Sequence, residues 1–269
     1  MTATPLPLPT PLLDDPAENF HLASRISPLI GHSHTGPYPE RFFAEPDLHL
    51  AFGVPTLFDG ASDGHDFAVP PGDHERGSVI GAMRERRSEN VFDAGRSIPR
   101  RALAAILTEA CGITDTHGRS APSPGRLYGL DCFVVVAGVA GVAPGFYGFH
   151  PFRHRLVRLG IPIDPRSWFS DALAYRTIAA TCGAMVFIAA AFDRLRIKYG
   201  QRGYRFALLE AGHVAQSLLL LAAAERVAAC AVGGYFDDEV DRTLGLNGLD
   251  ISVVHSVALG MPARGDRDD

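Results

Sequence analysis

The sequence has few cysteines and no two of them at metal-binding or redox spacing. The four, Cys111, Cys132, Cys182 and Cys230, lie far apart and form no C-x-x-C motif. Neither a zinc site nor a dithiol redox centre is therefore expected, and we predict no metal. Three of the four stand in apolar surroundings, which is typical of reduced core thiols in a cytoplasmic protein.

The common nucleotide-binding motifs are also missing. The chain has no G-x-x-x-x-G-K-[ST] and no G-x-G-x-x-G after a strand pattern, which argues against ATP hydrolysis and ordinary Rossmann binding of a dinucleotide. The longest apolar runs, residues 183–192 and 218–224, are too short to span a bilayer. A net charge of −5 gives no general attraction to nucleic acid or anionic lipid. Neither nucleic acid nor a membrane is expected as a partner.

Length and composition favour one domain with an extension. The chain has 269 residues, of which 46% are hydrophobic, and these suffice for a sizeable core. Residues 1–80 are rich in Pro, Gly, Asp and His, and they predict an irregular arm that packs on the body or on a partner subunit. The organised domain spans residues 80–264, and residues 265–269 form a tail.

Strand and helix patterns are interleaved through the organised domain. This order predicts an α+β fold with a central mixed sheet flanked by helices. Strand patterns cover residues 127–139, 145–149, 155–159, 185–191, 229–234 and 252–259. Helix patterns cover residues 102–110, 168–181, 204–226 and 237–244.

The longest helix pattern, residues 204–226, is apolar on nearly every side, so we expect it to be buried. Glu210, His213 and Gln216 stand three residues apart and are expected to form one polar stripe along a buried surface. Tyrosines, cations and glycines fill residues 198–205, just before the helix. Together they indicate a site, and a plain core helix with a satisfied polar stripe is the alternative.

Three places carry residues suited to an anion or to the close approach of a ligand. Arg86-Arg87-Ser88 offers two guanidinium groups and a hydroxyl, and arginine binds phosphate through paired hydrogen bonds. Pro122-Ser123-Pro124-Gly125 is a rigid loop whose glycine lets a flat ligand come near the backbone. Gly233-Gly234 together with Arg264 is the third. A phosphate-bearing cofactor would use such a set, although each place alone also fits a solvated surface.

Seven segments then occur in a characteristic order. They are Arg86-Arg87-Ser88, Pro122-Ser123-Pro124-Gly125, Leu127-Tyr128, Gly145-Phe146-Tyr147, the run from Lys198 to Arg205, the run from Glu210 to Gln216, and Gly233-Gly234-Tyr235-Phe236. In this order they resemble the nitroreductase superfamily and, within it, the SagB-type azoline dehydrogenases. The resemblance covers about residues 80–264.

The resemblance implies an FMN enzyme that oxidises thiazoline or oxazoline rings to thiazoles or oxazoles in peptides. It implies a homodimer with FMN at the interface, the long helix packed between subunits, and O₂ as the electron acceptor. The substrate would be a peptide or carrier-bound azoline, with a cyclodehydratase or a peptide synthetase as a candidate partner. The implied cofactor-binding residues are Arg86, Arg87, Ser88, Asn90, Pro122, Ser123, Gly125, Gly233, Gly234 and Arg264.

The family's lysine–tyrosine pair falls on Lys198 and Tyr199, which are therefore the predicted catalytic residues. A lysine in a dry, cation-rich pocket has a lowered pKa and can take a proton from the substrate. The same cation would make the tyrosine easier to deprotonate. Asn90 departs from the family, in which a lysine or arginine often stands near flavin N1 and O2. Either Arg84 or Arg205 substitutes for that cation, or the flavin potential is lower than usual.

Other functions stay open at this point. An NAD(P)H-dependent nitro or quinone reductase would have the same fold, and a non-catalytic scaffold would lack bound flavin. A hydrolase would use Ser123 as nucleophile with Asp193 and His213, but two prolines flank this serine and no strand directly precedes it. A carboxylate metal site would use Glu210-x-x-His213, of which the chain has only one copy.

Overall fold

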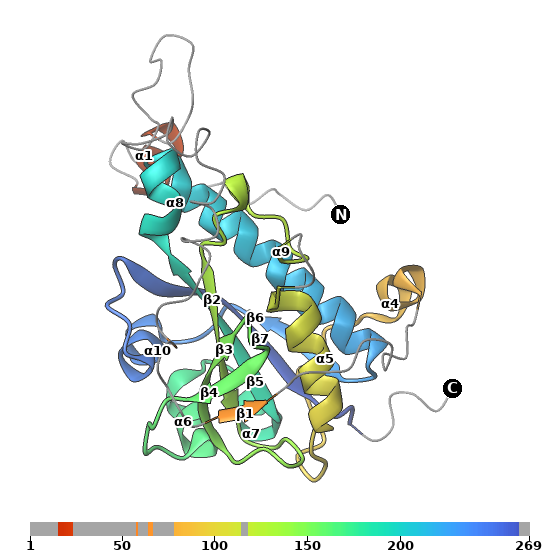
Figure 1. The fold of residues 1–269 in the computed structure, drawn as a ribbon. Helices are drawn as coiled ribbons and strands as arrows, with labels where there is room; N and C mark the ends of the chain where they lie inside the picture. The colour runs from red at the N-terminus through yellow and green to blue at the C-terminus, as the bar shows by residue number, and fades with distance from the viewer. Residues whose placement is uncertain (1–15, 24–57, 59–63, 67–77, 114–117, 264–269) are drawn as a thin grey trace, which may run out of the picture.

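The computed structural model describes residues 16–23, 58, 64–66, 78–113 and 118–263 (Figure 1). Most of the predicted arm and the tail lie outside these residues. Within them the helices are α1 (Pro16–Ala23), α4 (Val79–Glu85), α5 (Arg100–Cys111), α6 (Pro165–Ala172), α7 (Arg176–Thr181), α8 (Phe192–Tyr199), α9 (Arg202–Ala224) and α10 (Asp237–Leu244). The strands are β1 (Gly64–Asp66), β2 (Leu130–Val136), β3 (Gly145–His150), β4 (Arg155–Arg158), β5 (Ala184–Ala191), β6 (Ala228–Val232) and β7 (Ile251–Gly260).

The seven strands form one sheet in the order β1-β4-β3-β2-β5-β7-β6. Each ladder between these strands is antiparallel, so the prediction of a mixed sheet is wrong. β2, β3 and β4 follow one another through short connections, which favour antiparallel pairing. The crossover through α8 and α9 returns the chain to the edge beside β7, and β6 runs opposite to β7 there. Parallel pairing in the described part is confined to isolated bridges such as Ser88 with Ala229.

The sheet lies between two helical layers and has a separate core on each face. Along β2, Leu130 and Val134 pack in the cluster that contains α5 and α9. Phe133 and Val135 alternate with them and pack in the cluster that contains α6, α7 and α10. β2 and β5 are buried along their whole length, as the central strands of a three-layer domain must be.

Within the organised domain, most predicted elements agree with the observed ones and two differ, whereas α1 and β1 fall in the segment predicted to be irregular. The helix expected over residues 168–181 is two helices, α6 and α7, because the chain breaks at Leu173, whose backbone pairs with that of Tyr235. Residues 192–199, for which the sequence predicts no helix, form α8 directly after β5. α8 folds back on the start of α9, and Gly203 permits this close contact: a Cβ there would lie 2.8 Å from the backbone nitrogen of Arg196.

The long helix α9 packs its inner face on the sheet and leaves an apolar outer face. Tyr204, Leu208 and Leu209 are 40, 42 and 58% exposed. The polar stripe is only partly buried: Glu210 is inside, whereas His213 and Gln216 are exposed. Three residues turn a helix by about 300°, so successive members of the stripe lie about 60° apart around the axis. The stripe therefore winds from the buried face at Glu210 to the exposed face at His213 and Gln216. By length and composition α9 is also able to cross a membrane, but its inner face belongs to the protein core.

Three described pieces of the first 80 residues, α1, Phe58 and β1, contact the body. The Phe20 ring of α1 lies against Tyr204 of α9. β1 pairs with β4 at the edge of the sheet. Phe58 is buried, and its ring meets that of Phe133 edge to face with centroids 5.5 Å apart. A Cβ on Gly148 would collide with the Phe58 ring, so this glycine leaves room for the phenylalanine.

Candidate functional site

The predicted site residues form two groups at opposite ends of α9 (Figure 1). The Lys198 group, where α8 meets α9, consists of Pro122, Ser123, Gly125, Lys198 and Tyr199. The Ser88 group, beside the start of β6 just after α9 ends, consists of Arg86, Arg87, Ser88 and Asn90. α9 is about 35 Å long, so one chain does not bring the two groups together. Arg264 lies outside the described residues.

The loop that carries Ser123 is fixed by hydrogen bonds. The Ser123 hydroxyl donates to Glu210 Oε2 on α9 at 2.8 Å and accepts from the backbone N–H of Tyr128 at 2.8 Å. Arg126 and Tyr128 have positive φ values of 56° and 47°. Such conformations are costly for residues other than glycine, and they concentrate at functional sites. The strain makes this loop a good candidate for a ligand-binding segment.

Gly125 brings the loop against the predicted catalytic pair. Its φ is +59°, and a Cβ there would lie 2.6 Å from Tyr199 Oη and 2.9 Å from Lys198 Nζ. The sequence predicts that this glycine makes room for a flat ligand. In the structure it also makes room for the side chains of Lys198 and Tyr199.

Lys198 is a buried amine, not a surface cation. Its side chain lies at the end of α8 and is 5% exposed, with Nζ 5.4 Å from the centroid of the Tyr199 ring. Burial lowers the pKa of Lys198, because the charged form loses hydration. Burial also raises the pKa of Tyr199, so the expected easier deprotonation of this tyrosine is not found. Of the two, the lysine is the better candidate for a base, since burial favours its neutral form.

Two buried carboxylates hold this end of the molecule together, and sequence patterns did not indicate their roles. Asp131 on β2 forms a paired ion contact with Arg194 on α8, with N–O distances of 2.7 and 3.2 Å. This pair fixes α8, and with it Lys198, to the sheet. Glu210 is 2% exposed, and burial raises its pKa from 4.5 to about 7. Hydrogen bonds from Ser123 and the Gly129 backbone, and the charges of Arg119 and Arg194, oppose that rise.

The Ser88 group is open to solvent and differently built. Arg86 Nη1 donates to Ser88 Oγ at 3.4 Å, so a guanidinium and a hydroxyl lie side by side. Arg87 Nη1 donates to the carbonyls of Arg84 and Arg86, at 2.6 and 2.9 Å, near the end of α4. Arg86 and Ser88 therefore have the chemistry of a phosphate site, whereas Arg87 is engaged with the backbone. Asn90 is exposed beside them.

Gly233 and Gly234 follow β6, which begins next to the Ser88 group. Gly233 stands four positions after Ala229 along the chain, a span of about 13 Å in an extended strand. Gly233 is exposed, and a Cβ on it would meet nothing within 4 Å. Gly234 is packed, because a Cβ there would lie 2.5 Å from the Tyr175 ring. Of the two, Gly233 offers open backbone to a ligand.

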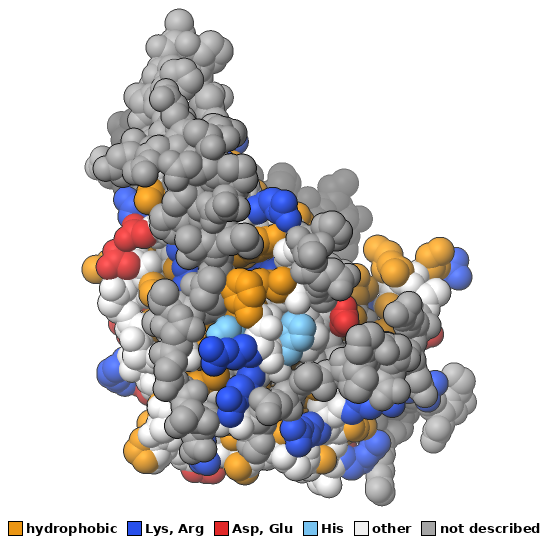
Figure 2. Space-filling view, viewed as in Figure 1, with side chains coloured by type: hydrophobic (Ala, Val, Ile, Leu, Met, Phe, Trp, Pro, Cys, Tyr) orange, Lys and Arg blue, Asp and Glu red, His pale blue; other side chains and the backbone are white. Residues whose placement is uncertain are grey.

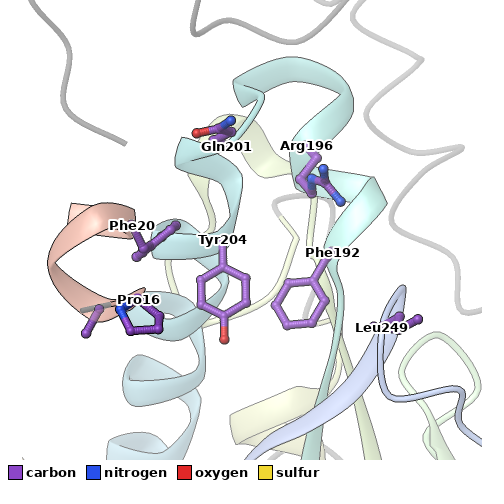
Figure 3. A pocket seen from close by; sticks show the side chains of 8 residues that line it. Pro16, Phe20, Phe192, Arg196, Gln201, Tyr204 and Leu249 are labelled. Atoms are coloured by element: carbon purple, nitrogen blue, oxygen red, sulfur yellow. The ribbon is translucent and has the colours of Figure 1, made fainter. Parts of the chain in front are cut away.

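A separate hollow of about 590 Å³ lies beside the Lys198 end of α9 (Figure 3). Its walls come from α1, α8, the start of α9 and the loop before β7, and the lining residues are Pro16, Ala17, Phe20, Phe192, Arg196, Gln201, Tyr204 and Leu249. The Tyr204 ring stacks on Phe192 with centroids 4.8 Å apart and meets Phe20 edge to face at 5.1 Å. This hollow is aromatic in character and distinct from the Lys198 group.

Apolar side chains are also exposed at the other end. On α4, Val79, Ile80 and Met83 are 71, 62 and 60% exposed. Figure 2 shows apolar side chains standing out from the body where α4 lies in Figure 1. With the outer face of α9, they give a single chain two uncovered apolar surfaces.

The geometry disfavours two of the alternative functions. Ser123 is bonded to a buried glutamate, and His213 is exposed on α9, so the described part of the chain does not assemble a serine–histidine pair. Among the described residues, no group of three or more His, Cys, Asp or Glu side chains is placed to hold a metal ion.

Comparison with known sequences agrees with the fold. A sequence model described as "Nitroreductase family" matches residues 83–261. The protein MJ1384 of Methanocaldococcus jannaschii, named as a candidate nitroreductase, is 36% identical over 147 residues, which are 54% of this chain and 73% of that protein.

Solved structures share the architecture. A candidate nitroreductase from Anabaena variabilis has a TM-score of 0.70 at 21% identity, over 95% of this chain and 49% of that one, so this chain spans about half its length. A chain of the E. coli microcin synthetase McbBCD complex, with truncated pro-MccB17 bound, has a TM-score of 0.58 at 19% identity, over 90% of this chain and 99% of that one. A candidate nitroreductase from Desulfovibrio desulfuricans, in complex with FMN, has a TM-score of 0.50 at 19% identity, over 70% of this chain and 88% of that one.

At these identities the solved structures establish the fold alone. The family model, however, spans more than half of the sequence. The arrangement of sheet, α9 and loops agrees with that match, and the chain belongs to the nitroreductase family.

Proposed function

We propose that this chain is an FMN-dependent dehydrogenase of the SagB type, which oxidises a thiazoline or oxazoline ring in a peptide to a thiazole or oxazole. The observation that carries the proposal is the buried amine of Lys198, held against Tyr199 and Gly125. Such an amine is suited to taking a proton from carbon, a step that azoline oxidation requires. The likeness in fold to a chain of a peptide-modifying synthetase complex supports this choice.

The residues present fit FMN. Arg86 and Ser88 would hold the phosphate, together with Arg264. The strained loop of Pro122, Ser123 and Gly125 would lie along the ring and ribityl chain, and Gly233 would offer its open backbone near the reactive edge. When bound, FMN supplies the hydride acceptor.

Two arginines were considered as substitutes for the cation that is missing at Asn90. Arg84 lies at the Ser88 end of α9, whereas the Arg205 guanidinium covers the Phe20 ring at the other end.

The ring oxidation divides into two transfers, and the chain's own residues perform one of them. An azoline becomes an azole by losing a proton from one ring atom and a hydride from its neighbour. The neutral amine of Lys198 takes the proton. Tyr199 keeps its own proton, because burial raises its pKa, and donates a hydrogen bond that orients the substrate. Overall, O₂ takes up the equivalent of the two hydrogens that the ring loses and is released as hydrogen peroxide, and the return of its proton leaves Lys198 neutral again.

A complete site needs two chains. The Lys198 and Ser88 groups are separated by the length of α9, and the outer face of α9 is apolar and exposed. Two copies with antiparallel α9 helices would cover that face and place the Lys198 group of one chain beside the Ser88 group of its partner. Isologous contact of this kind is the commonest way in which soluble chains pair.

Mixed dimers test the shared site directly. We would prepare Lys198→Ala and the double variant Arg86→Ala/Ser88→Ala, each with its own affinity tag, and co-express them to isolate the mixed dimer. Oxidation of an azoline peptide would be followed as the loss of two hydrogens by mass spectrometry, and bound FMN by visible absorption. We expect little turnover from either variant alone and recovery in the mixed dimer, which contains one intact site.

Other outcomes identify the alternatives. Two FMN-loaded variants that never complement would place the whole site within one chain. NAD(P)H-driven reduction of nitro compounds or quinones, without azoline oxidation, would make the protein a reductase. A colourless protein that binds a cyclodehydratase or synthetase partner would be a scaffold.

A further inference from the structure

The Glu210 carboxyl faces the ligand-binding loop from inside the protein. It lies on α9, accepts hydrogen bonds from the Ser123 hydroxyl and the Gly129 backbone N–H, and is 2% exposed. The charged groups around it are Arg119, from the segment before the loop, and Arg194, from α8, which is paired with Asp131 of β2. The reaction proposed above gives Glu210 no role.

The Ser123 hydroxyl has one hydrogen and two lone pairs, and this limits what it does. One lone pair accepts from the Tyr128 N–H, and the hydrogen is given to Glu210. While Glu210 is ionised, the hydroxyl therefore has no hydrogen for a ligand. A protonated Glu210 has a hydrogen of its own, which it can donate to the second lone pair of Ser123. The serine hydrogen is then released, and Ser123, which is partly exposed, can turn it outward.

We propose that Glu210 is a positioning residue whose protonation reverses its hydrogen bond with Ser123 and turns the serine hydroxyl into a donor for the bound ligand. The inference rests on the proposed FMN site and deepens it: Ser123 contacts an acceptor atom of the cofactor only in the acid form of Glu210. Because burial raises the pKa of Glu210 to about 7, the change falls near neutral pH.

Full-length protein without cofactor gives the first measurement. Carboxyl ¹³C NMR of glutamate-labelled protein should show one glutamate that titrates near neutral pH in the wild type and is missing in Glu210→Gln. In Ser123→Ala its titration should move to higher pH, since the serine hydrogen bond favours the ionised form. Absence of a near-neutral glutamate, or a midpoint that Ser123→Ala leaves unchanged, overturns the coupling.

FMN binding gives the second measurement. The wild-type dissociation constant and flavin spectrum should change across neutral pH with the same midpoint, the affinity by about tenfold or less, the worth of one hydrogen bond. Glu210→Gln, whose amide donates to Ser123 at every pH, should hold the acid-form spectrum and affinity throughout. Ser123→Ala should remove the pH dependence of binding but keep the shifted NMR titration. The exposed Asp238→Asn variant should match the wild type.

The two measurements separate the failure of this inference from the failure of the proposed function. A pH-dependent flavin spectrum that persists in Glu210→Gln overturns the inference while leaving the FMN site intact. Protein that binds no FMN overturns both the proposed function and the ligand-directed part of the inference, and the NMR titration then decides whether Glu210 and Ser123 are coupled at all. If Glu210→Gln does not fold, Ser123→Ala carries both measurements.

Discussion

The two ends of α9 differ in how much of a site one chain builds. At the Lys198 end, a single chain brings together a buried amine, a buried ion pair and a strained loop, and the hydrogen bonds of Ser123 hold the loop in place. At the Ser88 end, a partly exposed guanidinium donates to an exposed hydroxyl. The comparison suggests a division of labour. Under the proposed function, the rigid end supplies the base and the loop that contacts the flavin ring, whereas the exposed end supplies the groups that bind the phosphate.

The largest expected effect comes from removing the proposed base, Lys198, at the rigid end. Lys198→Ala should lower turnover by about 10²- to 10⁴-fold, the usual worth of a proton-transferring group, and should leave FMN binding intact. Steady-state oxidation of an azoline peptide, with flavin absorption for occupancy, measures both. Arg196→Ala is the matched control, because Arg196 lies on the same helix and faces the separate hollow. Full turnover by Lys198→Ala would remove this residue from the mechanism.

The second effect tests whether the rigid end depends on its ion pair. Asp131→Asn leaves Arg194 without its buried partner and should lower the free energy of unfolding by about 3–5 kcal/mol. Chemical denaturation measures this loss. Asp238→Asn, an exposed change on α10, should stay within about 0.5 kcal/mol of the wild type. Equal stability of the two variants would contradict the anchoring of α8 by Asp131.

The third effect is a dependence of stability on pH. The pKa of Glu210 is raised from 4.5 to about 7 in the folded protein. Its contribution to stability is therefore fully present below pH 4.5 and is lost as the pH rises through 7. The change amounts to at most about 3 kcal/mol. Urea denaturation over this range should show the decline in the wild type, and Glu210→Gln should flatten it. A slope that the substitution leaves unchanged would assign the effect to other groups.

The smallest expected effect comes from a substitution at the Ser88 end of α9. Arg86→Ala should weaken FMN binding by about 1.5–3 kcal/mol, the worth of a hydrogen bond to a charged group, and should leave the stability of the cofactor-free protein unchanged. Fluorescence titration with FMN measures the affinity. Arg87→Ala should weaken binding less, because the Arg87 guanidinium is bonded to backbone carbonyls. The reverse ranking would move the phosphate from Arg86 to Arg87.

Periodicity and motif order predicted much of the molecule. The short apolar runs of β2 and β5 and the long apolar run of α9 are local sequence signals, and these segments form the expected strands and helix. Strand direction was predicted less well, because it depends on where a long crossover rejoins the sheet. The order of motifs indicated both groups of candidate residues, whose roles stay predictions. It did not show that α9 keeps them apart, since sequence order carries no distance.

The buried polar contacts of the site could not be predicted from local sequence patterns. Ser123 and Glu210 are 87 residues apart in the chain, and Asp131 and Arg194 are 63 residues apart. Neither contact has a spacing that a helix or strand period reveals. The burial of Lys198 likewise depends on α8, which follows β5 without a break and has no distinct start signal.

The contact of Phe58 and β1 with the body has a practical consequence for shortened versions of the protein. Phe58 occupies the space over Gly148, and β1 covers one edge of β4. A chain that begins after residue 66 would lack the Phe58 side chain and would leave a cavity over Gly148. It would also leave the edge of β4 unpaired, and exposed strand edges promote aggregation. Crystallographers who wish to remove the leading segment would do better to keep everything from Phe58 onward.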